Sequence, residues 1–378
     1  MTAHRDRDTD LLLILNYYSP YVSGLTNVAR DVAEALAKRD WRVRVVATQH
    51  EPDLPPSEVV NGVAVERARV LTTIGKGPIS PEFIRRAIAF TDRAAVVNVH
   101  LPMLEAGVIT RFSRAPVVAS YHCDVSLPPG WLNDVQRLAI DASSRATLHR
   151  SAAVVVTSDD YAEHSRLWPQ LNGRTVAIPP PCHDRGAGMA RYRDGGGFHV
   201  GFLGRIVEEK GVEFLVDAVR GIDDPQLRLL IGGEFTTVAG GSVIERIRGR
   251  IAGDQRIKLL GFLADHEIAD FYASLDAFAL PSVNPFEAFG IVQVEAMMRG
   301  VPVLASNLPG VRVPVQETGH GVIAEVRDVA GIRRGLLALC DRTWDRTGGA
   351  RRARTAFSLD AVVDAYEEVF QSVMRSSG

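Results

Sequence analysis

Two glutamates, Glu287 and Glu295, lie eight positions apart in a stretch that joins a turn-forming segment to an apolar one, PSVNPFEAFGIVQVEAMMRG (281–300). Glu287 lies in a loop rich in Pro and Gly, whereas Glu295 lies in 290–299, which we predict to be helical. Eight helical residues span about 12 Å, enough to place a carboxylate at each end of a nucleotide sugar. The helix N-terminus between them has free N–H groups and a positive dipole end, which favour a diphosphate. Chance also produces such pairs, so the spacing alone does not establish a site.

Two cations, Arg205 and Lys210, lie in the segment GRIVEEKG (204–211), which follows an apolar run. Arg can bind phosphate oxygens in a fork, and Lys acts as a point charge. In a transfer reaction, both would stabilise the negative charge that develops on a departing phosphate. The alternative is that both are solvated loop residues with Glu208 or Glu209 as local partners.

The turn after the first apolar run, NYYSPYVSGLTN (16–27), has no G-x-G-x-x-G pattern, which disfavours a dinucleotide cofactor and a dehydrogenase. Gly24 instead precedes a helix predicted from about Asn27. A glycine there would let the backbone approach a ligand phosphate, with Thr26 or Asn27 as the N-cap. A glycine needed only for the turn explains the fragment equally well.

A third group of polar residues follows the apolar run PVVASYH (116–122). His122 and Asp124 are two positions apart, so in an extended chain they point to one side. They could act on hydroxyl groups in a cleft, or they could be a surface His beside a solvated Asp. The following segment, LPPGWL (127–132), is apolar and contains Trp131. It could be core packing, an acceptor wall or a membrane-facing patch.

The rest of the chain predicts the elements that hold these residues. A length of 378 residues suits two domains. Short, mostly Val-rich runs alternate with helical segments, which favours an α/β fold with open, parallel, doubly wound sheets. The predicted strands of the first half are 11–15, 41–47, 95–100, 116–122, 152–158 and 175–180, and 61–70 is predicted to be an excursion from the sheet. Those of the second half are 198–204, 227–233, 257–262, 276–282, 301–306 and 321–326.

Domain boundaries follow from a change in composition. Residues 179–197 are dense in Pro, Gly and charge, so we expect a first domain at 1–182, a linker at 183–197 and a second domain at 198–357. A last helix, about 358–378, could cap the second domain or return to the first.

Composition excludes several classes of protein. The formal net charge of −2 and the lack of Lys/Arg clusters disfavour nucleic acid as a partner. Three separated cysteines fit neither a disulfide framework nor a zinc site. No apolar run suits a secretory signal or a membrane span. We therefore expect a cytoplasmic protein that is soluble or at most peripheral to the inner face of a membrane.

Taken together, these motifs resemble the glycosyltransferases of family 4, a retaining group with the GT-B architecture. The resemblance covers most of the chain and rests on Ser23–Gly24, His122, GRIVEEKG, LLGFLADHEIADFYASLDAFALPS, FEAFGIVQVEA and a C-terminal helix with Tyr366. Its most specific part is the Glu-x7-Glu element. The resemblance implies two Rossmann-like domains that face each other across a cleft, with the C-terminal helix crossing back to the first domain.

Roles on the donor side follow from the same resemblance. It implies that Glu295 binds the ribose hydroxyls of the donor and that Glu287 lies beside the donor sugar. The backbone N–H groups of Phe289, Gly290 and Ile291 would meet the sugar and the distal phosphate.

The resemblance also implies how charge is handled. Arg205 and Lys210 would neutralise the leaving diphosphate without a metal ion, and Gly24 would approach the same phosphates. His122 would touch the transferred sugar, and we expect the acceptor near His122, Asp124 and Trp131.

Some positions depart from the family pattern. A single glycine stands in Ser23–Gly24 where two are common, Pro180–Pro181–Cys182 replaces an Asn-Gly pair, and the segment 232–234 is GGE rather than G-x-G. These changes put one phosphate contact and the linker geometry in doubt more than the chemistry.

The residues themselves indicate a cleft that stabilises an anion, with carboxylates placed for a ribose and a sugar. The resemblance adds the expectation of a retaining hexosyltransferase that uses a nucleoside diphosphate sugar as co-substrate and needs neither a metal nor another cofactor. Two alternatives remain open: a nucleotide-sugar epimerase of the same fold, and a sugar-nucleotide-binding protein without activity. The acceptor, whether a sugar, a lipid-linked sugar or a small molecule, and the base of the donor are not identified by the sequence.

Overall fold

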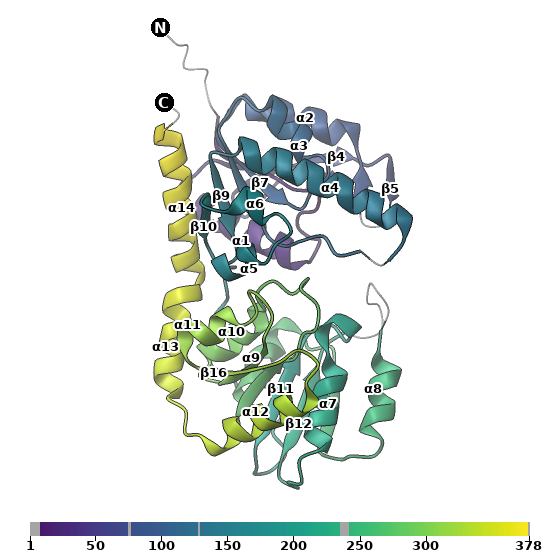
Figure 1. Cartoon of the computed structure of the whole chain (residues 1–378). Helices are drawn as coiled ribbons and strands as arrows, with labels where there is room; N and C mark the ends of the chain where they lie inside the picture. Colours follow the sequence, from purple (N-terminus) through teal and green to yellow (C-terminus); the bar gives the residue numbers. More distant parts are fainter. Residues whose placement is uncertain (1–7, 75–76, 128, 235–241, 377–378) are drawn as a thin grey trace. The chain divides into compact units, whose positions relative to one another are not determined.

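A computed structural model describes residues 8–74, 77–127, 129–234 and 242–376 (Figure 1). The chain forms two compact units. The first comprises Met1–Pro181 together with Leu359–Gly378, and the second comprises Cys182–Ser358. Each unit is described by itself below.

The first unit is a wound α/β domain around one largely parallel sheet of strand order β10-β9-β8-β7-β1-β2-β4-β3. Only the edge pair β3–β4 is antiparallel. The strands are β1 (Thr9–Ile14), β2 (Val43–Gln49), β3 (Ser57–Val60), β4 (Val63–Arg69), β7 (Ala94–Leu101), β8 (Val117–Tyr121), β9 (Ala153–Val156) and β10 (Thr175–Ala177), with a separate hairpin of β5 (Thr72–Ile74) and β6 (Gly77–Ile79). The helices are α1 (Gly24–Ala37), α2 (Pro81–Thr91), α3 (Ala106–Phe112), α4 (Trp131–Arg150), α5 (Asp159–Glu163) and α6 (Trp168–Leu171).

The second unit has a fully parallel sheet of order β13-β12-β11-β14-β15-β16. The order reverses between β11 and β14, as in a doubly wound nucleotide-binding fold. The strands are β11 (His199–Leu203), β12 (Arg228–Gly232), β13 (Ile257–Gly261), β14 (Ala277–Leu280), β15 (Val303–Ser306) and β16 (Gly321–Ala324). The helices are α7 (Val212–Arg220), α8 (Ile244–Ile251), α9 (Ile268–Ala273), α10 (Ile291–Met298), α11 (Val313–Thr318), α12 (Val329–Asp341) and α13 (Arg346–Phe357), with short 3₁₀ turns η1 (Glu208–Lys210) and η2 (Asp265–Glu267).

The predicted fold class is confirmed, since both units are Rossmann-like α/β domains with parallel sheets. Every predicted run forms a strand. The central strands are apolar and buried, as expected between covering helices, whereas β10, β13 and β16 at the sheet edges are partly exposed. The run 61–70 differs from the prediction: it is no excursion but β4, which pairs in parallel with β2 and carries β3 as an antiparallel edge.

The segment 183–197, predicted to be a linker, instead packs within the second unit. Arg185 forms an ion pair with Glu295, and Tyr192 donates a hydrogen bond to Glu267 and packs its ring against Phe271. The chain therefore passes between the units at Pro181–Cys182 and again at Ser358–Leu359.

The C-terminal helix α14 (Leu359–Ser376) belongs to the first unit. It buries one face, including Tyr366 and Phe370, in the core that contains residues of α1 and β2. Glu367 accepts hydrogen bonds from Arg39 at 2.8 Å and from the indole of Trp41 at 3.0 Å. Among the described residues, no helix has the length and apolar character needed to cross a membrane.

The packing of α14 yields a stability prediction. Replacing the fully buried Phe370 by Ala should cost about 3–5 kcal/mol, because the truncation leaves a cavity in the core. We expect the urea midpoint of the first unit, followed by circular dichroism, to fall accordingly. Glu368→Ala, an exposed change on the same helix, should alter the unfolding free energy by less than about 0.5 kcal/mol. Equal effects of the two changes would show that α14 is not part of this core.

Candidate active site

The predicted donor residues of the second unit follow two neighbouring strands. Arg205 and Lys210 come after β11, and Glu287 comes after β14. These two strands pair directly, and the strand order reverses between them. The carboxyl ends of parallel strands lie at one edge of a sheet, and the crevice at such a reversal point is the usual ligand site of this architecture.

Lys210 and Glu287 form an ion pair, and their side chains are 18% and 17% exposed. The pair depends on Gly211, which adopts a left-handed conformation with φ of +62°. A Cβ atom at this position would lie 2.2 Å from the carbonyl oxygen of Pro281, so only glycine lets the two loops approach this closely. The backbone N–H of Val283 also donates to the carbonyl of Glu209 at 2.9 Å. Two charged groups 77 residues apart are thereby held together, although still reachable from solvent.

Arg205 is more exposed and has a local partner, Glu209, at 2.5 Å. This is the arrangement that the sequence left open as the alternative to phosphate binding. An exposed ion pair of this kind contributes little to stability, so the guanidinium can exchange its partner for a phosphate at small cost.

The N-terminus of α10 lies between the two glutamates in the chain. Gly290 caps the helix with φ of +84°, and a Cβ atom there would lie 2.3 Å from Leu280 Cδ2, so the turn requires glycine. Phe289 is buried, and Ile291 is the first helical residue. The first turn contains no acidic side chain, so the free N–H groups of the helix start are not neutralised by a local carboxylate.

Glu295 lies on the buried side of α10 and is only 2% exposed. Its Oε1 accepts from Nε and Nη2 of Arg185 at 2.9 and 2.7 Å, and its Oε2 accepts from the Tyr272 hydroxyl at 3.1 Å. Burial raises the pKa of Glu295, and the Arg185 guanidinium opposes that rise. The carboxylate that the sequence assigns to the donor ribose is thus already engaged by an arginine that the sequence placed in a linker.

In the first unit, Gly24 is the first residue of α1, three positions earlier than predicted. The N-cap is Ser23, not Thr26 or Asn27: its hydroxyl accepts from the Thr26 N–H at 3.2 Å, which satisfies one of the free donors of the helix start. A Cβ atom at Gly24 would meet no described atom within 4 Å. Internal packing therefore does not require this glycine, and space remains in front of the helix.

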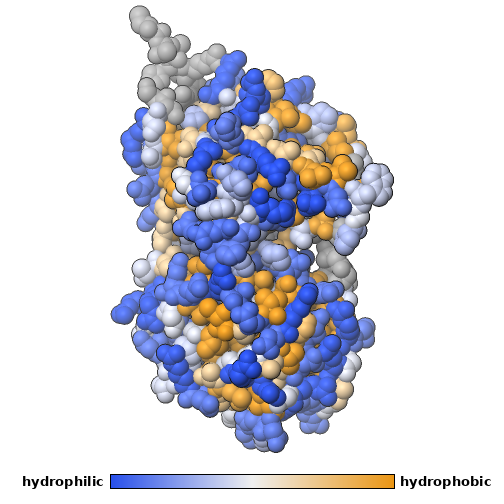
Figure 2. All heavy atoms as spheres, in the orientation of Figure 1, coloured by the Kyte–Doolittle hydropathy of each residue, from blue (hydrophilic) through white to orange (hydrophobic). Residues whose placement is uncertain are grey.

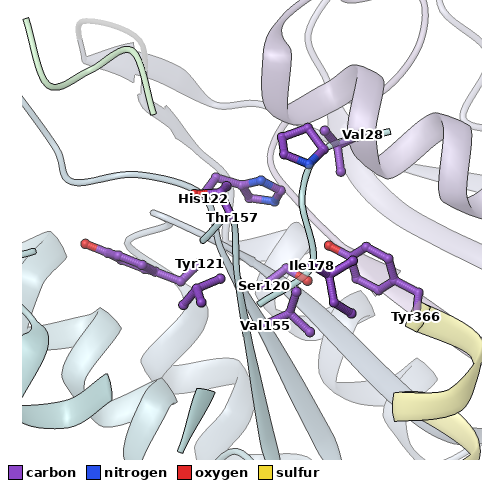
Figure 3. A pocket seen from close by; sticks show the side chains of 10 residues that line it. Val28, Ser120, Tyr121, His122, Val155, Thr157, Ile178 and Tyr366 are labelled. Carbon is purple, nitrogen blue, oxygen red and sulfur yellow. The ribbon is translucent and has the colours of Figure 1, made fainter. Parts of the chain in front are cut away.

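His122 follows β8 and contacts a histidine that the sequence analysis did not single out. His100 Nδ1, at the end of β7, lies 2.9 Å from His122 Nε2, and the two rings are nearly coplanar. His122 also lines a small cavity of about 10 Å³ with Ser120, Thr157 and Tyr366, so α14 contributes to the wall of this site (Figure 3).

The hydrogen bonding of the two histidines indicates a tautomer. Burial lowers the pKa of His122 to about 4 and holds that of His100 well below its usual range, so both rings are neutral at pH 7. His100 Nε2 is buried and has no partner among the described residues. The proton of His100 is therefore better placed on Nδ1, where His122 Nε2 accepts it, than on Nε2. His122 then carries its own proton on Nδ1 and can donate from there.

Asp124 turns away from His122, contrary to the expectation that the two point to one side. Its carboxylate accepts from Tyr121 and from Ser165 Oγ at 2.8 Å, and Arg166 lies beside it. The backbone leaves the strand at His122, so the alternation of an extended chain no longer applies. His122 contacts β7, whereas Asp124 contacts the segment after β9, on the other side of β8. Trp131 begins α4 and is largely exposed.

Residues missed by the sequence analysis share one property, which is that their roles depend on long-range contacts. His100 had one usable signal, a polar residue at the carboxyl end of an apolar run. Arg185 had none, because it lies in no motif and at no strand end. Tyr272 lies within the segment LLGFLADHEIADFYASLDAFALPS, but nothing local in that segment indicates that its hydroxyl contacts Glu295.

One prediction from this site concerns Arg185. Arg185→Ala should destabilise the protein by about 3–5 kcal/mol at about pH 8, because it leaves the buried Glu295 carboxylate unpaired. Without the arginine the pKa of Glu295 rises further above its unfolded value. Proton uptake then favours the folded state, and the cost should shrink as the pH falls toward about 4. Chemical denaturation at both pH values measures this. Asp265→Ala removes the other partner of Arg185, a carboxylate that is 85% exposed, and should cost less than about 1 kcal/mol. A pH-independent cost of Arg185→Ala would contradict the assignment.

Another prediction from this site concerns the pair of His100 and His122. The ¹⁵N chemical shifts of the imidazole rings at pH 7 should show His122 as the neutral Nδ1–H tautomer. They should also show no protonation of His122 between about pH 5.5 and 8, since its pKa lies near 4. In His100→Leu the Nδ1–H donor is lost, and we expect a mixture of the two tautomers at His122. An Nε2–H tautomer in the unaltered protein would reverse the assignment.

Two family models match the chain, one in each unit. The model described as "Glycosyl transferase 4-like domain" matches residues 23–181, and the model described as "Glycosyl transferases group 1" matches residues 192–349. Together they include every residue that the sequence analysis proposed for the site.

Curated relatives of the chain are also named as glycosyltransferases. A D-inositol 3-phosphate glycosyltransferase of Geodermatophilus obscurus is 33% identical, over 90% of this chain and 83% of that protein. The protein of the same name from Corynebacterium efficiens is 30% identical over 62% of this chain, and the match covers 57% of that protein's length.

Solved structures show the same fold. Sucrose-phosphate synthase from Thermosynechococcus elongatus has a TM-score of 0.77 at 22% identity, covering 97% of this chain and 100% of that one. HepE of Anabaena, solved in complex with UDP-glucose, has a TM-score of 0.72 at 18% identity, covering 96% of this chain and 99% of that one. The family models, the relatives and the fold together show that this chain belongs to the GT-B glycosyltransferases of the family 4 type.

Proposed function

We propose that this glycosyltransferase is a retaining, metal-independent hexosyltransferase that uses a nucleoside diphosphate sugar. The observation that carries the proposal is the accessible Lys210–Glu287 pair at the reversal point of the second sheet. A cation for the leaving phosphate and a carboxylate for the sugar stand side by side there. The UDP-glucose bound by HepE supports a donor of this class.

Each candidate site residue of the second unit has a role in this proposal. Lys210 and Arg205 exchange their carboxylate partners for the diphosphate and stabilise the charge that develops on it. The N–H groups of Phe289, Gly290 and Ile291 bind the sugar and the distal phosphate. Glu287, once released by Lys210, accepts hydrogen bonds from the sugar hydroxyls and stabilises positive charge at the anomeric carbon.

Glu295 binds the ribose in this proposal, which requires a rearrangement. A carboxylate offers about four acceptor positions, of which Arg185 and Tyr272 use three. The ribose hydroxyls therefore share the carboxylate with Arg185 or displace it. In the first unit, Gly24 leaves room for a phosphate, and His122 donates from Nδ1 to a hydroxyl of the transferred sugar.

The reaction itself proceeds on one face of the sugar. The bond between the anomeric carbon and the diphosphate oxygen breaks, and a bond from the acceptor oxygen forms on the same side. The proton of the acceptor hydroxyl passes to an oxygen of the leaving phosphate, so no residue of the protein needs to act as a nucleophile. An acceptor site near His122, Asp124 and Trp131, and a cytoplasmic location, belong to the same proposal.

Product and donor experiments test this directly. The anomeric configuration of the product, read from ¹H coupling constants, should match that of the donor, and activity should survive a chelator. A panel of nucleoside diphosphates should identify the base by thermal stabilisation. Inversion would overturn the mechanism. An epimer formed from donor without acceptor would indicate the epimerase, and binding without transfer or hydrolysis would indicate an inactive binding protein.

Kinetic variants test the residues. Lys210→Ala and Glu287→Ala should each lower kcat by about 10²–10³, because both act on charge in the transition state. Glu295→Ala should chiefly weaken binding of the free nucleotide, measured by calorimetry. Lys258→Ala is a matched control, since Lys258 pairs with Asp194 in the same unit and should turn over normally. Near-normal kcat in both Lys210 and Glu287 variants would remove them from the site.

A further inference from the structure

Helix α4 exposes its apolar side and buries its polar side. Trp131, Leu132, Val135 and Leu138 are 75%, 63%, 58% and 56% exposed. The side chains that it buries are Asp141, Ser144, Thr147 and Leu148, of which three are polar. A helix on the surface of a globular domain normally shows the reverse pattern. The exposed side of α4 is therefore a candidate interaction surface.

The neighbouring helix α3 extends this surface. The N–H of Gly107 donates to Ser143 Oγ at 2.8 Å, and a Cβ atom at Gly107 would lie 3.2 Å from the Ser143 backbone, so α3 and α4 are in close contact. Val108 and Phe112 of α3 are also exposed. Figure 2 shows apolar side chains gathered over the region of these two helices. We call the exposed side chains of α3 and α4 the α3–α4 face.

The charges on this face are mostly positive. Arg145 lies seven residues after Leu138, on the same side of α4, and Arg145, Arg150 and Arg111 are all exposed. Asp134 is the one exposed carboxylate on the two helices, both of which lie within the described part of the chain. Apolar groups combined with arginines fit a partner that has an apolar interior and an anionic surface. A second copy fits less well, because two such faces would bring arginines against arginines.

We propose that the α3–α4 face binds a lipid bilayer that contains anionic lipids. The first turns of α4 enter the boundary between headgroups and acyl chains, and Arg111, Arg145 and Arg150 bind lipid phosphates. Helix α4 starts at the carboxyl edge of the first sheet, ten residues after β8. This is the edge that carries His122, so docking brings that edge of the first sheet toward the membrane. The proposal does not depend on the transfer chemistry above.

Co-sedimentation of the full chain with vesicles tests the proposal. The protein should bind vesicles of phosphatidylcholine with phosphatidylglycerol, and it should bind phosphatidylcholine alone much more weakly. Trp131→Ser/Leu132→Ser should lower the partition coefficient by more than about tenfold, because the inserted apolar area is lost. Arg111→Gln/Arg145→Gln should lower it by about fivefold per arginine, and high salt should have a similar effect.

Matched variants test whether any loss of binding is specific to the α3–α4 face. Val59→Ser removes an equally exposed apolar side chain on β3 and should leave binding unchanged, and Arg145→Lys should retain it. Thermal melts should show that all variants fold. Equal binding to both kinds of vesicle, or none, would overturn the proposal. A second outcome would also overturn it. The unaltered protein would form dimers in sedimentation velocity and bind no vesicles, and the Trp131→Ser/Leu132→Ser variant would be monomeric.

Discussion

Lys210 and Glu287 can meet only because the loops that carry them leave the same edge of a parallel sheet at two adjacent strands, β11 and β14. Parallel strands place all their carboxyl ends at one edge, and this brings groups 77 residues apart in the chain within reach. The final approach depends on one backbone position, Gly211, because any side chain there would collide with the carbonyl of Pro281. The chemistry proposed for the second unit thus depends on sheet topology and on a single glycine.

The two glutamates of the Glu-x7-Glu element differ in their surroundings. Glu287 stands in a loop beside a lysine that solvent can still reach, and the proposed function requires a diphosphate to replace Glu287 at that lysine. Glu295 is buried in α10, where Arg185 neutralises it and Tyr272 donates to it. Removing a buried charge from its partner is expensive. In the proposed function, the donor therefore reaches Glu287 through a partly exposed ion pair but has to rearrange the buried contacts of Glu295.

The sequence predicted the elements well because burial on both faces of a parallel sheet leaves a strong, local pattern of apolar runs. It missed β3, since SEVV alternates between exposed and half-buried positions at an edge. The loops with Arg205, Lys210 and Glu287 were also predictable, because motifs at strand ends are local. Arg185 was not predictable: its segment has the composition of a linker, and only the folded chain shows that it lies against Glu295. His100 had a local signal, its place at the end of an apolar run, but its contact with His122 depends on the pairing of β7 with β8.

In the first unit, a short connection joins His122 to the start of α4, the helix proposed to bind the membrane. The ten residues from His122 to Trp131 begin at a histidine held by His100 and end at the exposed apolar start of α4. Asp124 fixes this connection near its start through Tyr121 and Ser165, and Arg166 holds it through the carbonyl of Val125. If α4 docks as proposed, a force on it acts on a segment whose first residues are anchored by part-buried hydrogen bonds of Asp124, next to the histidine pair.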